Sequence, residues 1–303
     1  MRDLGRYLVP GGMAAFLSES GREVAQAADA GVSKLEQEAF AYRRRALLQD
    51  PHAPNVEALK KAGSDYLSAG LASDKSGKGG WDYLFEKGLC ELAEAIHLPE
   101  GSRRHENIRS AGTAIGRMTD AETLKTMERL SGKKYSSAEK HRFMAWSAIA
   151  SQESLKTRLE KGDYSLIGPA YNRIFAGVDR RNLLDEAYVP ALVGAAVLKL
   201  DLYEESPLSV DGSNENPYKE NVVGQGRGHL ATLAELCSRN GWLPKATRDK
   251  QPDVTAVIEQ IQKESDGTKD LRRLDAIQAL MYLQRSGGEA LKEFNKLIGK
   301  KTS

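Results

Sequence analysis

The chain has 303 residues, of which 40% are hydrophobic and 28% are charged. This balance excludes a wholly disordered protein and allows one large or two modest folded domains. Lysine and arginine number 44 against 42 aspartates and glutamates, so the charge gives no strong sign of nucleic-acid binding. Because the sequence has no apolar run of about 18 residues and no continuous signal-peptide core, we expect a cytoplasmic protein without a membrane span, or one exported without a cleaved signal.

The cysteines and histidines give no sign of a metal site. Cys90 and Cys237 each sit within an apolar stretch of helical character, which predicts two buried, reduced thiols rather than a disulfide. The five histidines are scattered, and none pairs with a cysteine or another histidine at the spacing of metal ligands.

The first quarter of the chain predicts two amphipathic helices. Apolar residues between positions 12 and 49 recur at intervals of three, four and seven, which indicates one long helix or two helices with a break near Gly31. Arg43, Arg44 and Arg45 fall on its late turns, where we expect them to form a solvated face. Proline ends this helix, and a second covers residues 55–71. The Gly- and Lys-rich residues 73–80 then divide the chain into an N-terminal part, residues 1–72, which forms a protruding hairpin, and a core domain, residues 73–303.

The middle of the chain predicts a helical core. Residues 81–96 form an apolar helix, and two capping boxes place further helix starts near Asp120 and Ser137. The boxes pair Thr119 with Glu122 and Ser136 with Glu139. Further helices cover residues 164–175 and 182–203, and the second of these carries the most apolar stretch of the chain, which favours a central position.

The last third combines a long polar loop with more helices. Residues 205–223 contain two prolines and a glycine, and such loops are uncommon in compact domains unless they have a function. A helix is expected from residue 228 to 239 with Gly241 as its stop, and about three more helices follow over residues 253–298. The sequence therefore predicts a mostly α protein, a bundle of about ten to twelve helices.

A glycine-rich segment before the helix at residue 228 is the first candidate site. Gly224, Gly226, Arg227 and Gly228 follow the polar loop. A glycine turn at the start of a helix directs free backbone N–H groups and the positive end of the helix dipole at an anion, and an arginine adds a planar fork for phosphate oxygens. The alternative is a simple turn into the helix, whose arginine pairs with a surface carboxylate.

The order of these residues resembles the motif H-P-F-x-[D/E]-G-N-G-R of the Fic family of helical nucleotide-transfer enzymes. The resemblance covers about 30 residues, from Asn216 to Pro244. It implies a nucleotide ligand, a phosphate cradle at Gly224, Gly226 and Arg227, and a metal-holding carboxylate at Glu220. Asn216 replaces the histidine that acts as general base in the family, and an amide cannot take up that proton. Three inserted residues, 221–223, also separate Glu220 from the cradle, so the resemblance implies a degenerate Fic-like fold of the kind found in bacterial effectors.

A second resemblance concerns Glu153. The segment AWSAIASQES is similar to the end of the buried helix on which lysozyme-like hydrolases and transglycosylases carry a catalytic glutamate followed by serine, and an apolar setting would suit a general acid. The other interpretation is a solvated Glu153 on the polar face of an amphipathic helix, which is what we expect.

The sequence thus leaves three functions open. It favours a non-catalytic or degenerate-catalytic helical interaction protein of effector type, with another protein as its partner, because no catalytic motif is intact. A Fic-like nucleotide- or phosphate-binding transferase that uses the segment from Gly224 to Arg227 is the alternative, and a hydrolase with Glu153 is a less favoured one. The cofactor, and whether the chain is an enzyme, stay open.

Overall fold

The computed structural model describes residues 19–158, 164, 166–203, 219–244, 252–265 and 270–302. These residues form twelve α-helices and no strand, which confirms the mostly α bundle. The helices are α1 (Glu19–Leu48), α2 (Val56–Lys75), α3 (Trp81–His97), α4 (Ser102–Arg117), α5 (Ala121–Ser131), α6 (Ser137–Arg158), α7 (Ile167–Phe175), α8 (Val189–Val197), α9 (Lys219–Arg239), α10 (Val254–Glu264), α11 (Leu271–Ser286) and α12 (Glu289–Thr302). Short 3₁₀ turns, η1 (Asn182–Leu184) and η2 (Glu186–Tyr188), precede α8, and a π-helical turn, η3 (Leu198–Leu202), follows it.

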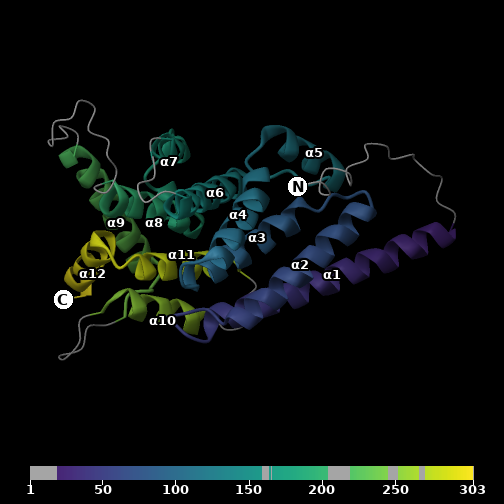
Figure 1. Ribbon diagram of the computed structural model, residues 1–303, viewed down its shortest axis with the longest axis horizontal. Coiled ribbons are helices and arrows are strands. Elements are labelled where there is room, and N and C mark those ends of the chain that lie inside the picture. Colours follow the sequence, from purple (N-terminus) through teal and green to yellow (C-terminus); the bar gives the residue numbers. More distant parts are fainter. Residues whose placement is uncertain are drawn as a thin grey trace.

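The helices pack mainly against their neighbours in sequence. α1 lies along α2, α2 along α3 and α3 along α4, and α4 then contacts α6. In the other half of the molecule α8 packs against α6, α9 and α11. All nine residues of α8 are buried, as expected for a helix that is apolar on every side. The result is an elongated bundle with the start of α1 at one end and α12 at the other (Figure 1).

The N-terminal hairpin differs from the sequence prediction in two details. α1 continues through Gly31 without a break, and it runs past the end of the shorter α2 (Figure 1). α2 begins after its N-cap Asn55 and continues to Lys75, so the boundary that we predicted at residue 73 falls inside a helix. The division into two domains stays a prediction. Leu47 of α1 nevertheless belongs to the main hydrophobic cluster of the bundle.

One of the two predicted helix caps occurs as expected, and the other is formed by the neighbouring residue. Ser136 and Glu139 form the expected capping box: the amide of each residue donates to the side chain of the other, at 2.8 and 3.2 Å. Before α5, Asp120 rather than Thr119 is the N-cap, because its carboxylate accepts from the amide of Thr123 at 2.7 Å. A carboxylate at this position also meets the positive end of the helix dipole. Both cysteines are buried and unpaired, as predicted.

A buried cluster of charges joins four of the helices. Arg43 of α1 donates to Glu86 of α3 at 2.6 Å and to Asp275 of α11 at 2.7 Å. Arg142 of α6 donates to the same two carboxylates, at 2.6 Å to Glu86. The indole N–H of Trp146 donates to Asp275 at 3.1 Å. We call Arg43, Glu86, Arg142 and Asp275 the charge cluster.

The charge cluster corrects the interpretation of the arginine triplet. Arg43 is 0% exposed, whereas we predicted a solvated face for residues 43–45; only Arg45 is exposed. The two arginines hold the pKa of Asp275 below its usual range against the opposing effect of burial. Because two cations meet two carboxylates, the cluster has no net charge, which is the condition for burying ions at an acceptable free energy.

Candidate functional site

The glycine segment is not a turn. Gly224, Gly226 and Gly228 lie inside α9, which begins at Lys219 rather than at residue 228. Backbone N–H groups in the interior of a helix are bonded to carbonyl groups of the preceding turn and cannot bind an anion. The glycine turn on which we based the predicted phosphate cradle is therefore absent from these residues, and phosphate binding there stays a prediction.

Helix packing accounts for one of these glycines. A Cβ atom on Gly226 would lie 2.8 Å from Cγ of Leu200, so glycine lets α9 pack closely against η3. Gly224 and Gly228 face open space. Glu220 and Arg227 are exposed on α9, and no ion pair of Arg227 occurs among the described residues. Asn216 lies outside the described residues.

Glu153 is buried rather than solvated, which corrects the second interpretation. It is 1% exposed on α6. Its carboxylate accepts from the hydroxyl of Tyr282 at 2.9 Å, from Lys156 at 2.5 Å and from Arg104 at 3.3 Å. Burial holds the pKa of Tyr282 well above its usual value, so this hydroxyl remains a donor.

The two carboxylate oxygens of Glu153 accept hydrogen bonds from three side chains, so that Glu153 of α6 is linked to Arg104 of α4 and Tyr282 of α11. A general acid needs an oxygen that can reach a substrate, whereas both oxygens of Glu153 are engaged inside the protein. Glu153 is also not among the residues that line the groove described next. Its surroundings are those of a structural ion pair.

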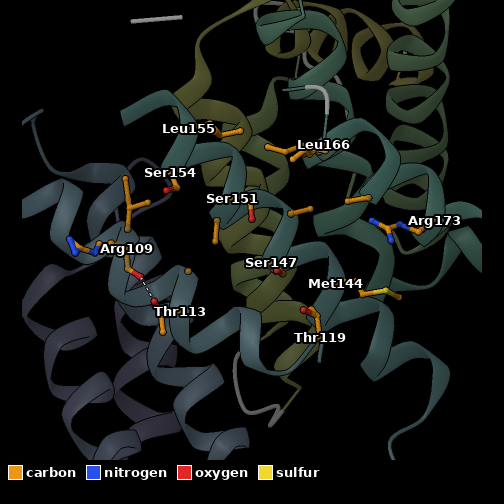
Figure 2. Close-up of a pocket in the computed structure, with 16 residues that line it drawn as sticks. Arg109, Thr113, Thr119, Met144, Ser147, Ser151, Ser154, Leu155, Leu166 and Arg173 are labelled. Carbon is orange, nitrogen blue, oxygen red and sulfur yellow. Dashed lines mark hydrogen bonds between the residues drawn. The ribbon is translucent and has the colours of Figure 1, made fainter. Parts of the chain in front are cut away.

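A groove lies between α4, α6 and α7. It has a volume of about 650 Å³, within the range of ligand sites. Figure 2 shows the groove with α6 as its floor and with α4 and α7 on either side. Its lining residues are Ile108, Arg109, Gly112, Thr113, Thr119, Met144, Ser147, Ala148, Ala150, Ser151, Ser154, Leu155, Leu166, Ile167, Ala170 and Arg173.

Two arginines, Arg109 and Arg173, give the groove positive charge. No carboxylate lines it among the residues that the structure describes. Arg109 lies at the α4 edge and Arg173 at the opposite, α7 edge, with the guanidinium of Arg173 turned toward the groove (Figure 2). Arg173 donates only to the carbonyl of Pro169, at 3.4 Å, and Arg109 forms no ion pair within the described part of the chain. Each guanidinium is thus available to an external carboxylate.

A row of hydroxyl groups crosses the floor between the arginines. Ser147, Ser151 and Ser154 lie on one face of α6 because positions four and three residues apart are neighbours on a helix. None of their hydroxyls has a hydrogen-bond partner among the residues described. They can therefore donate to, or accept from, a ligand in the groove. Their spacing is visible in the sequence, but we did not interpret it as a site.

Apolar side chains complete the groove. Ile108 is buried beneath it, and Met144 and Leu155 of α6 are half-buried. Leu166, at the start of α7, is 80% exposed, the highest value for a large hydrophobic residue in the described ranges. A large apolar side chain held out to solvent beside a groove is typical of a docking surface.

Neither a metal site nor a membrane-spanning helix occurs among the described residues. Across the described ranges no three His, Cys, Asp or Glu side chains are placed to hold a metal ion together. In the same residues no helix has both the length and the hydropathy that a bilayer crossing requires.

Comparisons with known proteins do not assign the chain to a family. No protein-family model, no curated protein and no solved structure matches it. The Fic-like resemblance of residues 216–244 is thus neither supported nor contradicted by a relative.

Proposed function

We propose that the chain is a non-catalytic interaction protein whose α4–α6–α7 groove binds an acidic, leucine-bearing segment of a partner protein. The observation that carries the proposal is a groove whose described lining holds two arginines, no carboxylate and three serine hydroxyls without a hydrogen-bond partner among the described residues. Acidic side chains of the segment would pair with Arg109 and Arg173, and its backbone would bond to the serines. Its leucines would pack against Leu166 and Leu155.

The composition of the groove supports binding rather than catalysis. Arginine cannot act as a proton acceptor near neutral pH, and the described part of the lining holds no histidine, lysine, cysteine or carboxylate. A serine needs a neighbouring base to become a nucleophile, and none of the described lining residues is such a base. Charge complementarity gives an acidic segment its orientation and speeds its association.

A peptide titration tests this proposal. The probe is a fluorescein-labelled peptide, Glu-Glu-Leu-Leu-Glu-Glu, and its fluorescence anisotropy is followed as the protein is added. We expect saturable binding with a Kd on the order of 100 µM, a value reasonable for a short segment that must lose conformational freedom. A peptide in which lysine replaces every glutamate should not bind.

Two matched variants locate the binding. Ser151 is exposed in the groove and Ser110 is exposed on α4 outside it. Ser151→Glu should weaken binding at least about ten-fold, because like charges placed opposite each other cost several kcal/mol, whereas Ser110→Glu should change it little. Equal effects of the two variants, or no saturable binding by the wild type, would contradict the proposal.

A further inference from the structure

A second cleft lies between the end of α7, η3 and α9. It has a volume of about 610 Å³. Lys199 of η3 lines it together with Gln225, Gly228, His229 and Thr232 of α9. The other lining residues, from the α7 end of the cleft, are Asn172, Phe175, Ala176, Val178, Arg180 and Leu183.

Lys199 is the charged group of this cleft that lacks a counterion. Its side chain is 7% exposed, and its ammonium donates to the side-chain oxygen of Gln225 at 2.6 Å. No carboxylate among the described residues lies within ion-pair distance. Every other buried charged side chain of the described residues does form an ion pair. An ammonium has three donors, and burial without a counterion is costly.

His229 lines the same cleft as Lys199. Its ring is stacked on Phe175, with 4.7 Å between centroids, and it has no hydrogen-bond partner in the described part of the chain. Burial, together with the charge of Lys199, lowers the pKa of His229 to about 4. The imidazole is therefore neutral at pH 7 and offers one N–H donor. Arg180 lies at the rim, where it pairs with Glu235 at 3.5 Å.

We propose that this cleft binds a small oxyanion, a carboxylate or phosphate group, which pairs with Lys199 and accepts hydrogen bonds from His229 and Asn172. The ligand supplies the counterion that Lys199 lacks among the described residues. Stacked rings and the apolar side chains of Val178 and Leu183 provide a surface for the body of a molecule that carries the anion. The site is independent of the α4–α6–α7 groove, since the two share no lining residue.

Thermal unfolding with added anions tests the proposal. The probes are sodium phosphate and sodium acetate, each compared with sodium chloride at equal ionic strength. We expect one or both to raise the Tm of the wild type in a saturable way, by about 5 °C at 100 times the Kd. The two arms tell a phosphate site from a carboxylate site.

Substitutions at two lysines decide whether the effect arises in the cleft. Lys199→Met keeps the length of the side chain and should abolish the shift. Lys263→Met is the matched control, because Lys263 is exposed on α10 and forms no ion pair among the described residues; it should leave the shift unchanged. His229→Gln keeps an N–H donor and should reduce affinity only a few-fold.

Two results would overturn the proposal. The first is a wild-type response to phosphate and acetate no larger than the response to chloride. The second is a shift that survives in Lys199→Met. Circular dichroism of Lys199→Met, which should match that of the wild type, separates a lost site from a lost fold.

Discussion

Arg43 and Lys199 are almost equally buried, yet their surroundings are opposite. Arg43 donates to two carboxylates and to the amide oxygen of Gln278, whereas Lys199 meets one amide oxygen and no carboxylate among the described residues. Burial alone therefore does not show which cations of this protein stabilise the packing of its helices. The partner of each cation does: Arg43 joins helices through two carboxylates, whereas Lys199 lines a cleft and meets no carboxylate among the described residues.

The largest expected effect comes from breaking the charge cluster. Arg43→Met leaves Glu86 and Asp275 with only Arg142 to share, and breaking a buried ion pair costs about 3–5 kcal/mol. Arg45→Met, two residues along the same helix and exposed, should change stability by less than about 0.5 kcal/mol. Urea unfolding measures both. Equal, small effects would show that the cluster contributes no stability.

The next effect is acid destabilisation at His229. Its folded-state pKa of about 4 lies below its ordinary value of 6.5, so between these pH values the unfolded chain binds more protons than the folded one. Stability is therefore lost as pH falls from 6.5 to about 4, by about 3 kcal/mol from this group.

Two variants isolate the contribution of His229. Among the described residues, Lys199 and Arg180 are the charged groups that line its cleft. The charge of Lys199 opposes protonation of His229, and Arg180 is paired with Glu235. His229→Gln should flatten the curve of unfolding free energy against pH in this window. His105→Gln, a change at an exposed histidine on α4, should not. A wild-type curve that is flat between pH 6.5 and 4 would refute the prediction.

A smaller effect of opposite sign is expected at Lys199. Replacing an unpaired buried ammonium with a methionine of similar length removes a desolvation cost. Lys199→Met should therefore raise the free energy of unfolding, by about 1–2 kcal/mol in an anion-free buffer. Denaturant titration checks it. Destabilisation instead would mean that Lys199, like Arg43, already has an internal counterion besides its bond to Gln225.

The smallest effects concern the glycines of α9. Gly224→Ala should stabilise the protein by about 0.5–1 kcal/mol, because alanine has the higher helix propensity and faces open space there. Gly226→Ala should destabilise it, since the new Cβ atom meets Leu200. Thermal melts of the pair distinguish a helix from a turn: in a turn with positive φ, alanine at position 224 would be destabilising.

The sequence predicted most helices because each depends on local pattern, but it missed α4. It also predicted one helix over residues 182–203, where the structure has two 3₁₀ turns before α8 and a π-helical turn after it. The spacing of apolar residues indicated α1, the apolar character of residues 81–96 indicated α3, and the capping box of Ser136 and Glu139 marked the start of α6. Gly241 adopts the expected left-handed φ of +73° after α9. α9 was predicted too short, because three glycines near its start indicated a turn, while the reason for Gly226 is its contact with distant Leu200.

The charged residues could not be predicted in the same way. Arg43 is bonded to Asp275, which lies 232 positions away in the sequence, and Glu153 is bonded to Tyr282, 129 positions away. Nothing in a local pattern separates Arg43 from Arg45. The three serines of the groove lie on one helix, α6, so their spacing is visible in the sequence. Arg109 and Arg173 lie on two other helices, α4 and α7, and only the folded structure brings them to the same groove. Lys199 was hidden inside the most apolar predicted helix.

The most direct test of the account is a side-chain NMR titration of the arginines. Spectra of the Nε–Hε groups would be recorded as the Glu-Glu-Leu-Leu-Glu-Glu peptide is added, with assignment by single substitutions. The account predicts saturable shifts of Arg109 and Arg173 with one shared Kd, and no shift of Arg43 or Arg142. Shifts of similar size at all exposed arginines, Arg45 included, would contradict it, because the groove would then bind no better than any positive surface.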